Sequence, residues 1–233
     1  MGFFIRRGIM KHLLLSRTIL DHPDVYSEMK KHLTQRDKVL VILYSFFDVW
    51  FPTEDHYQTY YDDQNEYVLK MKRQFAMYHI HDIQFLNYYR DDKETRLKKI
   101  SEATVLYFPG GAPDQMMKRF DKHQLIQPLK AFKGLTIGSS AGAMIHLKKP
   151  HLYKDDDYDK FQYIQGLGYL DGFDISVHYR RRNQQDKAIR RVVHEKHIDM
   201  YAIPDDGAIF IHDQHISLLG TARKIMNKKG QFL

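Results

Sequence analysis

The chain has 233 residues, of which 43% are hydrophobic and 28% charged, with a formal net charge of +7. These values exclude a disordered chain, and the length suits a single domain over residues 1–233 better than two domains. The sequence contains no cysteine, which excludes disulfides, thiolate metal sites and a cysteine nucleophile. No apolar stretch approaches a membrane span, and residues 13–15 give way at once to Ser16 and Arg17. We therefore expect a cytoplasmic protein without a signal-peptide core or a membrane partner.

The basic residues are scattered among acidic ones instead of forming one basic tail. This mixed pattern argues against a nucleic-acid partner, because phosphate-binding surfaces gather lysine and arginine on one face. The positive net charge fits a preference for acidic substrates equally well.

Short β-rich apolar runs alternate with longer amphipathic stretches along the whole chain. The expected strands cover residues 12–16, 39–46, 83–88, 104–108, 135–138, 173–177, 200–204, 208–212 and 216–219. The expected helices cover residues 25–34, 63–79, 93–102, 115–120 and 186–197. This alternation predicts an α/β fold with a mostly parallel, doubly wound sheet and helices on both faces.

The most informative motif is Gly138-Ser-Ser-Ala-Gly142, which follows an apolar strand and precedes a helix-compatible stretch. A G-x-S-x-G sequence in this context predicts a nucleophile elbow, because small neighbours allow a sharp turn that exposes the central side chain. That side chain is Ser140. Its hydroxyl would lie near a helix N-terminus, where free N–H groups such as that of Ala141 favour developing negative charge. A Gly/Ser turn that only packs a strand on a helix, or a phosphate-binding loop, is the alternative.

A second strand end opens through Gly110 and Gly111 into a helix. At the carboxyl edge of a parallel sheet, such a pair can present backbone N–H groups at close range. We expect Gly110, Gly111 and Ala141 to form an oxyanion hole, although glycines also end strands for purely steric reasons.

These motifs resemble those of the peptidase E and cyanophycinase group, serine peptidases with a class I glutamine amidotransferase-like (flavodoxin-like) three-layer fold. The resemblance rests on residues 108–111, residues 138–143, and residues 166–168 followed by 175–180, in the family's order and spacing. It extends over nearly the whole chain. Amidotransferases of this fold carry cysteine at the elbow, so the resemblance implies the serine branch.

The resemblance implies that His178 is the general base. It lies 38 residues after Ser140 and directly follows an expected strand, in the sequence His-Tyr-Arg. A histidine within hydrogen-bond reach can take the serine proton and return it to the leaving amine.

The third member implied by the resemblance is a carboxylate in residues 202–207. Asp205 aligns best with the family's glutamate, and a shift of one residue selects Asp206; aspartate is one methylene shorter. The acidic run of residues 155–157 offers a third possibility. An Asp-Asp-Gly turn between two strands also needs no catalytic reason, because these residues favour turns.

A different order of residues remains open. In α/β-hydrolases the acid precedes the histidine, and Asp174 or Asp205 followed by His212 or His215 satisfies that order. An esterase-type serine hydrolase is therefore an alternative, and a catalytically silent binding member of the same fold is another.

For substrate binding, the resemblance points to the segment after the base. Tyr179, Arg180 and Arg182 lie there, and arginine forks suit the carboxylates of aspartyl peptides, the typical substrates of the family. Asp114 is a further candidate, although Ala112 and Pro113 stand where the family often has polar residues. The expected substrate is thus a small peptide or amide, with Asp-containing peptides as a possible class.

No cofactor or metal is expected for this chemistry. His79 and His81 flank one residue but lack a matched second pair of ligands. The sequence leaves open whether the protein is a monomer or a homodimer.

Overall fold

The structure is a computed structural model that describes residues 10–213 and 215–231. Its strands are β1 (Lys11–Leu15), β2 (Val39–Ile42), β3 (Ile83–Leu86), β4 (Val105–Phe108), β5 (Leu135–Ser139), β6 (His151–Leu152), β7 (Gln162–Tyr163), β8 (Phe173–Val177), β9 (Asp199–Ile203), β10 (Gly207–His212), β11 (His215–Gly220) and β12 (Arg223–Met226). Its helices are α1 (Pro23–Met29), the 3-10 turn η1 (Asp48–Trp50), α2 (Glu54–Tyr60), α3 (Glu66–Ala76), α4 (Lys93–Glu102), α5 (Pro113–Lys122), α6 (Ile126–Ala131), α7 (Ala141–Met144) and α8 (Asn183–Lys196).

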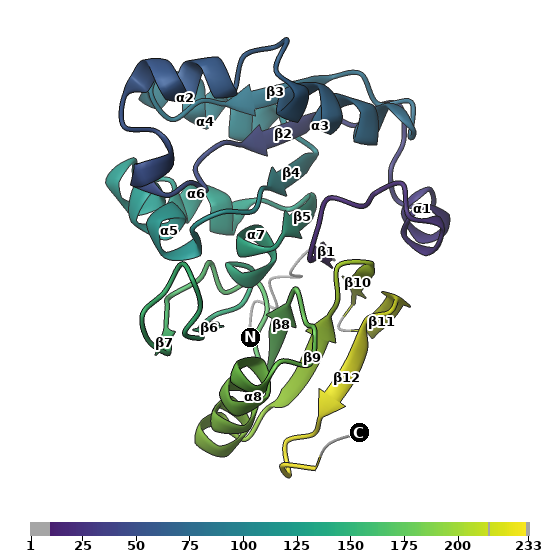
Figure 1. The fold of residues 1–233 in the computed structure, drawn as a ribbon. Coiled ribbons are helices and arrows are strands. Elements are labelled where there is room, and N and C mark those ends of the chain that lie inside the picture. Colours follow the sequence, from purple (N-terminus) through teal and green to yellow (C-terminus); the bar gives the residue numbers. More distant parts are fainter. Residues whose placement is uncertain (1–9, 214, 232–233) are drawn as a thin grey trace, which may run out of the picture.

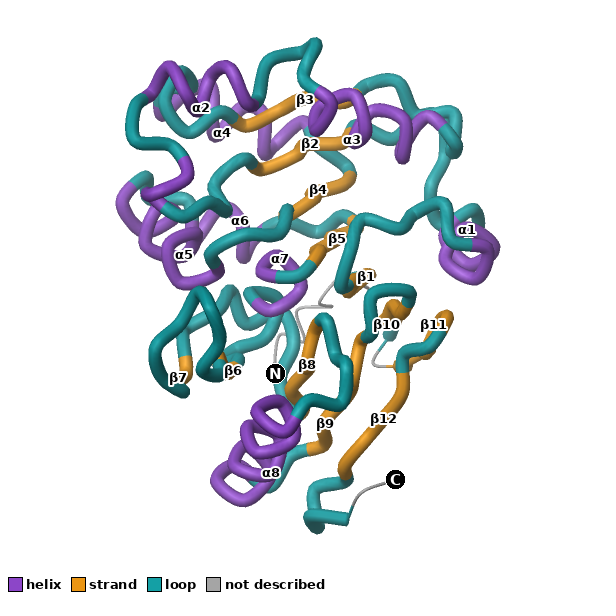
Figure 2. Tube along the Cα trace, viewed as in Figure 1, coloured by secondary structure: helices purple, strands orange, loops and turns teal. Residues whose placement is uncertain are grey.

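A seven-stranded sheet with the order β11-β10-β1-β5-β4-β2-β3 forms the centre of the fold (Figure 1). Strands β1, β5, β4, β2 and β3 run parallel, and β10 and β11 add an antiparallel edge. Helices lie on both faces, as the tube view also shows (Figure 2). The predicted α/β three-layer architecture with a mostly parallel sheet is confirmed.

A second sheet of three strands has the order β12-β9-β8, with β8 and β9 parallel. The sequence did not separate these strands from the central sheet. Helix α8 covers one face of this small sheet, where Ile189, Val192 and Val193 pack on Met200 and Ala202 (Figure 1). The other face packs against the central sheet, where Ile175 and Ile203 lie in one buried cluster with Leu14 and Ala143, so that β8 lies close to α7.

The two faces of the central sheet follow the alternation of side chains along its strands. In β1, β2 and β4, odd-numbered residues such as Leu13, Val41 and Tyr107 pack with α1, α2 and α3. Even-numbered residues such as Leu106 and Phe108 pack with α4, α5, α6 and α7. Because both faces are covered, these strands are continuously apolar, as is typical of parallel sheets.

The apolar run of residues 39–46 does not form one long strand. Strand β2 ends at Ile42, and the chain turns while its next residues stay buried. Arg119 of α5 holds this turn, because its guanidinium donates to the carbonyl oxygens of Tyr44 at 3.0 Å and Phe46 at 2.6 Å. The predicted strand was therefore too long, since burial alone does not distinguish a strand from a buried turn.

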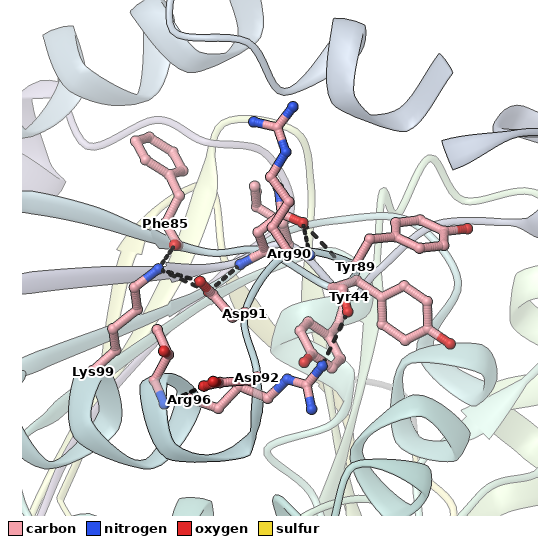
Figure 3. Close-up of polar contacts among 12 residues, drawn as sticks. Tyr44, Phe85, Tyr89, Arg90, Asp91, Asp92, Arg96 and Lys99 are labelled. Atoms are coloured by element: carbon pink, nitrogen blue, oxygen red, sulfur yellow. Dashed lines mark hydrogen bonds and ion pairs between the residues drawn. The ribbon is translucent and has the colours of Figure 1, made fainter. Parts of the chain in front are cut away.

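The loop between β3 and α4 is closed by Lys99 (Figure 3). Its ammonium group donates to the carbonyl oxygen of Phe85 at 2.9 Å and to both oxygens of Asp91 at 2.8 Å. Asp92 caps α4 by accepting from the N–H of Thr95 at 2.8 Å. The predicted bounds of this helix are correct because such a cap is a local sequence signal.

A buried polar chain crosses the centre of the fold. His146 lies two residues after the end of α7 and is fully buried; its Nδ1 lies 2.7 Å from the carbonyl oxygen of Gly142. Its Nε2 lies 2.9 Å from Thr136 Oγ1, which lies 2.6 Å from His12 Nδ1. Because a carbonyl only accepts, His146 carries its proton on Nδ1, Thr136 donates to Nε2, and His12 donates to Thr136. The chain of donors is complete with both rings neutral.

We predict that this chain makes the fold acid-sensitive. Burial lowers the pKa of His12 to about 4, and burial followed by the nearby His12 lowers the pKa of His146 to about 3, from an ordinary 6.5. Below pH 6.5 these two histidines bind protons in the unfolded chain but not in the folded chain, so the free energy of unfolding falls as the pH falls. In denaturant melts between pH 6.5 and 5.0, the free energy of unfolding should fall by about 1 kcal/mol or more per pH unit.

The variant His146→Met should show a smaller pH slope, because one of the two neutral rings is gone. The exposed His56, changed to Gln, is the matched control and should leave the slope unchanged. A wild-type stability that stays constant over this range would contradict the assignment of neutral rings.

Candidate active site

Ser140 forms the turn between β5 and α7 and has an unusual backbone conformation. Its φ is 50° and its ψ is −114°, a region that costs a non-glycine residue on the order of 1–3 kcal/mol. Its N–H donates to the carbonyl oxygen of Leu15 at 2.8 Å, and its own carbonyl accepts from the N–H of Met144 at 3.1 Å. These bonds hold the strained turn that presents the hydroxyl at the sheet edge.

The glycines of the motif are required by close contacts. A Cβ on Gly138 would lie 2.4 Å from the backbone of Gly142, and a Cβ on Gly142 would lie 1.9 Å from the carbonyl oxygen of Phe108. Both distances are far below any permitted contact. The G-x-S-x-G pattern therefore lets α7 begin directly against β4 and β5, as the nucleophile elbow predicted from the sequence requires.

His178 lies directly after β8 and bridges Ser140 and Asp205. Its Nε2 lies 3.0 Å from Ser140 Oγ, and its Nδ1 lies 2.6 Å from Asp205 Oδ1. An ionised carboxylate only accepts, so Nδ1 carries the proton and Nε2 is left to accept from the serine hydroxyl. This is the tautomer that a general base for Ser140 needs.

Asp205 is held by more than the histidine. Its Oδ2 accepts from Arg180 at 2.8 Å and forms an ion pair with Arg17 at 3.1 Å. Burial opposes ionisation, but the hydrogen bonds from His178, Arg180 and Arg17 together hold the pKa of Asp205 well below its usual range. The carboxylate therefore stays charged at any pH at which the histidine could act as a base.

Ser16, directly after β1, joins the two sheets behind the site. Its hydroxyl donates to the carbonyl oxygen of Ile203 and accepts from the N–H of His178 at 2.9 Å. His178 has a positive φ of 50°, so its position depends on such contacts. A single hydroxyl on the central sheet thus fixes the residue that carries the imidazole.

Of the three residues predicted for the oxyanion hole, Gly111 and Ala141 line the same pocket as Ser140, and Gly110 approaches Ser140 itself. A Cβ built on Gly110 would lie 3.8 Å from Ser140 Oγ, so this backbone approaches the nucleophile closely. Gly111 has a φ of 136°, and a Cβ there would lie 2.0 Å from the carbonyl oxygen of Ser45. Ala141 is the first residue of α7, so its N–H has no acceptor within the helix. Their role as oxyanion donors stays a prediction.

Two of the predicted substrate-binding residues are engaged in structural contacts. Asp114 in α5 accepts from the Tyr158 hydroxyl at 2.8 Å and holds the loop that contains that tyrosine. The Tyr179 hydroxyl donates to Asp186 at 2.8 Å, and its ring packs in the core beneath α8. The structure brings neither of them into the wall of the pocket beside Ser140.

The other two are not among the residues that line the pocket beside Ser140. Arg180 donates to Asp205, and Arg182 is the exposed residue before α8. Asp206, the alternative acid, is exposed and accepts from the Thr221 hydroxyl. His178 Nδ1 donates to Asp205 Oδ1 at 2.6 Å, so the geometry favours Asp205 as the orienting carboxylate.

The histidines and the aspartate of the esterase alternative do not lie beside Ser140. His212 and His215 face each other across β10 and β11, beside the first residue of β1. Ser140 follows β5, whose last residue lies beside the last residue of β1, so the length of that strand, about 13 Å, separates the two positions. Asp174 bonds His151 instead, with its Oδ2 3.1 Å from Nδ1 of that ring.

A pocket opens beside the hydroxyl of Ser140. It is lined by α7 and the turn before it, the start of α5 and the turn before it, β6 and the loop after it, and the end of β8, namely by Gly111, Pro113, Ser140, Ala141, Met144, His151, Leu152, Tyr153, Asp155, Asp157, Tyr158, Ile175, Ser176, Val177 and His178. The wall combines apolar side chains with a few polar groups, as is typical of binding sites for small molecules and short peptides. The nucleophile and its base therefore face a space that a substrate can enter.

The comparison with known proteins identifies the family. The profile of peptidase family S51 matches residues 57–219, which is more than half of the chain and includes Ser140, His178 and Asp205. The chain belongs to peptidase family S51. No curated protein matches the chain.

Two solved structures share the fold of this S51 chain. A protein described as a candidate peptidase E from Listeria monocytogenes EGD-e matches with a TM-score of 0.62 and 16% identity, over 93% of this chain and 99% of that one. A peptidase from an acI-B1 Actinobacterium matches with a TM-score of 0.61 and 14% identity, over 95% and 96% of the two chains. At such identities the likeness concerns the fold alone.

Residues 10–213 and 215–231 contain no group of three histidine or acidic side chains placed to hold a metal ion. In the same ranges, none of the helices has the length and apolar character needed to cross a membrane.

Sequence reasoning missed Ser16 and Arg17, which both act on the site. The sequence does contain a signal for both residues. They directly follow β1, and the carboxyl ends of parallel strands meet at one edge of the sheet. It also missed the buried hydroxyl chain in which Tyr107 donates to Ser139 Oγ at 2.9 Å, next to the nucleophile. The apolar surroundings of that tyrosine give no sequence signal for its partner.

We predict that Asp205→Asn lowers kcat by about 10³- to 10⁴-fold, because an amide can donate to Nδ1 and stabilise the wrong tautomer of His178. Asp206→Asn is the matched control and should leave kcat within about threefold. Steady-state kinetics on one peptide substrate, with the melting temperature of each variant, would check this. A larger loss from the Asp206 variant would contradict the assignment of the acid.

Proposed function

We propose that the chain is a serine peptidase that hydrolyses a peptide or amide bond in a small substrate, with Ser140, His178 and Asp205 as its triad. The observation that carries this proposal is the unbroken line from Ser140 Oγ to His178 Nε2 at 3.0 Å and from His178 Nδ1 to Asp205 Oδ1 at 2.6 Å. Membership of a peptidase family supports the reaction class.

In this mechanism Ser140 Oγ attacks the carbonyl carbon of the scissile bond while its proton moves to His178 Nε2. The negative charge on the carbonyl oxygen is received by backbone N–H groups of Gly110, Gly111 and Ala141. Collapse of the tetrahedral intermediate breaks the carbon–nitrogen bond, and the leaving amine takes the proton from His178. Water, activated by the same base, then hydrolyses the ester on Ser140.

Asp205 supports both steps through charge. An imidazolium forms on His178 in each transition state, and the ionised carboxylate beside Nδ1 stabilises it. Arg17 and Arg180 keep that carboxylate ionised and fixed, since both bind Oδ2 and leave Oδ1 for the histidine. They are positioning residues, because they act through Asp205.

Preference for Asp-containing peptides rests on the family resemblance, on the positive net charge and on Arg180 and Arg182. Within residues 10–213 and 215–231, the pocket wall contains no lysine or arginine. The dipeptidase class and a cytoplasmic location remain predictions, as do a small-peptide partner, a monomeric or homodimeric state and a single domain.

A fluorophosphonate probe tests the proposal directly. Labelling should occur on Ser140, should vanish in Ser140→Ala, and should be strongly reduced in His178→Ala. The Ser140 variant should also lower kcat by at least about 10³-fold without loss of folded stability. Labelled sites are read by peptide mass spectrometry, and folding by circular dichroism.

His215→Ala is the control that separates the esterase alternative, because its loss should change neither labelling nor peptide turnover. A chain that folds but resists the probe would be a silent member of the family. An unchanged kcat in the Ser140 variant would reject the proposed nucleophile.

A further inference from the structure

A second cavity lies at the amino edge of the central sheet. Its wall includes Met10, which precedes β1, and Lys133, which precedes β5, whereas Ser140 follows the carboxyl end of β5. The cavity has a volume of about 850 Å³, which is in the range of binding sites for small molecules. It shares no lining residue with the pocket beside Ser140. The two cavities are therefore separate sites at opposite edges of the sheet.

His12 contributes a nearly buried ring to the wall of this second cavity. The residue is 3% exposed, and its ring stacks on that of Tyr169, which also lines the cavity, with centroids 5.4 Å apart. Its Nδ1 lies 2.6 Å from Thr136 Oγ1, but its Nε2 has no hydrogen-bond partner within residues 10–213 and 215–231. This unbonded nitrogen is not sealed from solvent. We conclude that Nε2 opens to the cavity that His12 lines.

The buried polar chain behind His12 makes this nitrogen an acceptor. The carbonyl of Gly142 only accepts, so His146 donates to it from Nδ1, Thr136 donates to His146, and His12 donates to Thr136 from Nδ1. Moving the proton of His12 to Nε2 would leave Thr136 Oγ1 without that donor. Burial also lowers the pKa of His12 to about 4, so the ring is neutral near pH 7. The group that matches Nε2 is therefore a hydrogen-bond donor, such as a hydroxyl.

The same wall carries a surplus of positive charge. Lys130 and Lys133 are exposed, and neither forms an ion pair with any residue in the described part of the chain. The third lysine of the wall, Lys148, is paired with Asp171, with Nζ 3.1 Å from Oδ2. The other carboxylate of the wall belongs to Asp213 and lies 3.7 Å from a ring nitrogen of its neighbour in sequence. Two ammonium groups therefore remain free to pair with an anion.

We propose that the second cavity binds a small molecule that carries both an anionic group and a hydroxyl, such as a sugar phosphate or a polyhydroxy acid. The hydroxyl donates to His12 Nε2, and the anionic group pairs with Lys130 and Lys133. The two groups lie at different places on the ligand, because His12 is nearly buried whereas both lysines are exposed. The inference is independent of the proposed function, because the catalytic triad takes no part in this site.

Calorimetry on the full-length protein at pH 7 tests the proposal with ligands that separate the two groups. Ribose 5-phosphate and gluconate carry both groups, butyl phosphate and hexanoate carry the anion alone, and ribose and sorbitol carry hydroxyls alone. At least one of the two-group ligands should bind at least about fivefold more tightly than its anion-only partner and its uncharged partner. Comparison of the phosphate series with the carboxylate series shows which anion the lysines prefer.

The lysines are tested by the double variant Lys130→Gln, Lys133→Gln, which removes two exposed charges without touching the core. It should weaken binding of the two-group ligand by at least about fivefold, with a larger loss at low salt, because salt screens exposed charges. The double variant Lys70→Gln, Lys98→Gln is the matched control. Both of these lysines are exposed and lie outside the cavity wall, so their loss should leave the affinity within about twofold of wild type.

His12 is tested by His12→Phe, which keeps a ring against Tyr169 and removes Nε2. This variant should bind the two-group ligand no more tightly than the anion-only ligand, and circular dichroism checks that it folds. Nitrogen-15 NMR of the wild-type protein gives a readout that does not depend on the variant. It should show His12 Nε2 as an unprotonated nitrogen whose resonance moves upfield when the ligand is added, because its lone pair then accepts a hydrogen bond.

Three results would overturn the inference. The first is equal affinity for both two-group ligands and their anion-only partners, or no binding of any ligand at millimolar concentration. The second is an affinity that the Lys130 and Lys133 substitutions do not change. The third is a His12 Nε2 resonance that stays in place while the ligand binds, which would place the hydroxyl elsewhere.

Discussion

The site depends on one constraint, the fixed contact between two sheets. Ser140 stands on the central sheet, whereas His178 and Asp205 follow strands β8 and β9 of the small sheet. The 3.0 Å contact between serine and imidazole therefore exists only while the sheets keep their relative position. No covalent bond other than the backbone joins them, since the sequence has no cysteine.

That contact is maintained by packing and by one hydroxyl. Apolar side chains from both sheets, including Leu14, Ile175 and Ile203, form a buried cluster between them around α7. Each such side chain contributes roughly 1.5–3 kcal/mol when fully buried. Ser16 adds specific hydrogen bonds to this packing, because its hydroxyl accepts from the N–H of His178 and donates to the carbonyl oxygen of Ile203. The apolar packing therefore stabilises the contact between the two sheets, and the Ser16 hydroxyl fixes their relative position.

Charge is divided across the site in a way that composition cannot reveal. The net charge of +7 suggests an acidic ligand, yet the two arginines nearest the base neutralise Asp205. Among lysine, arginine, aspartate and glutamate side chains, the pocket wall contains only the carboxylates of Asp155 and Asp157 within the described residues. Local pairing therefore decides which charges a ligand meets.

Features that depend on neighbours in sequence were predictable. The elbow at Ser140 follows from its glycines, β8 from its apolar run, and α4 from its cap at Asp92. The role of His178 could not be predicted from its position after a strand alone, and the resemblance to the family was needed to select it. Asp205 was preferred over Asp206 on alignment, and the hydrogen bond to the histidine agrees.

Features that depend on distant contacts were not predictable. The pairing of β8 with β9 outside the central sheet is set by packing on α7 and α8, which no local pattern encodes. Helices α2 and α6 are short, with seven and six residues, and carry too little periodicity to be recognised. Arg180 was expected to bind substrate because its partner, 25 residues later, could not be seen in the sequence.

A crystal structure of the wild-type protein after reaction with a small alkyl phosphonate tests the central claim most directly. The account predicts a covalent bond from Ser140 Oγ to phosphorus, with one phosphoryl oxygen against the N–H groups of Gly110 or Gly111 and Ala141, and His178 still bonded to Asp205. A modified residue elsewhere, or an imidazole turned away from Ser140 in the intact protein, would contradict it.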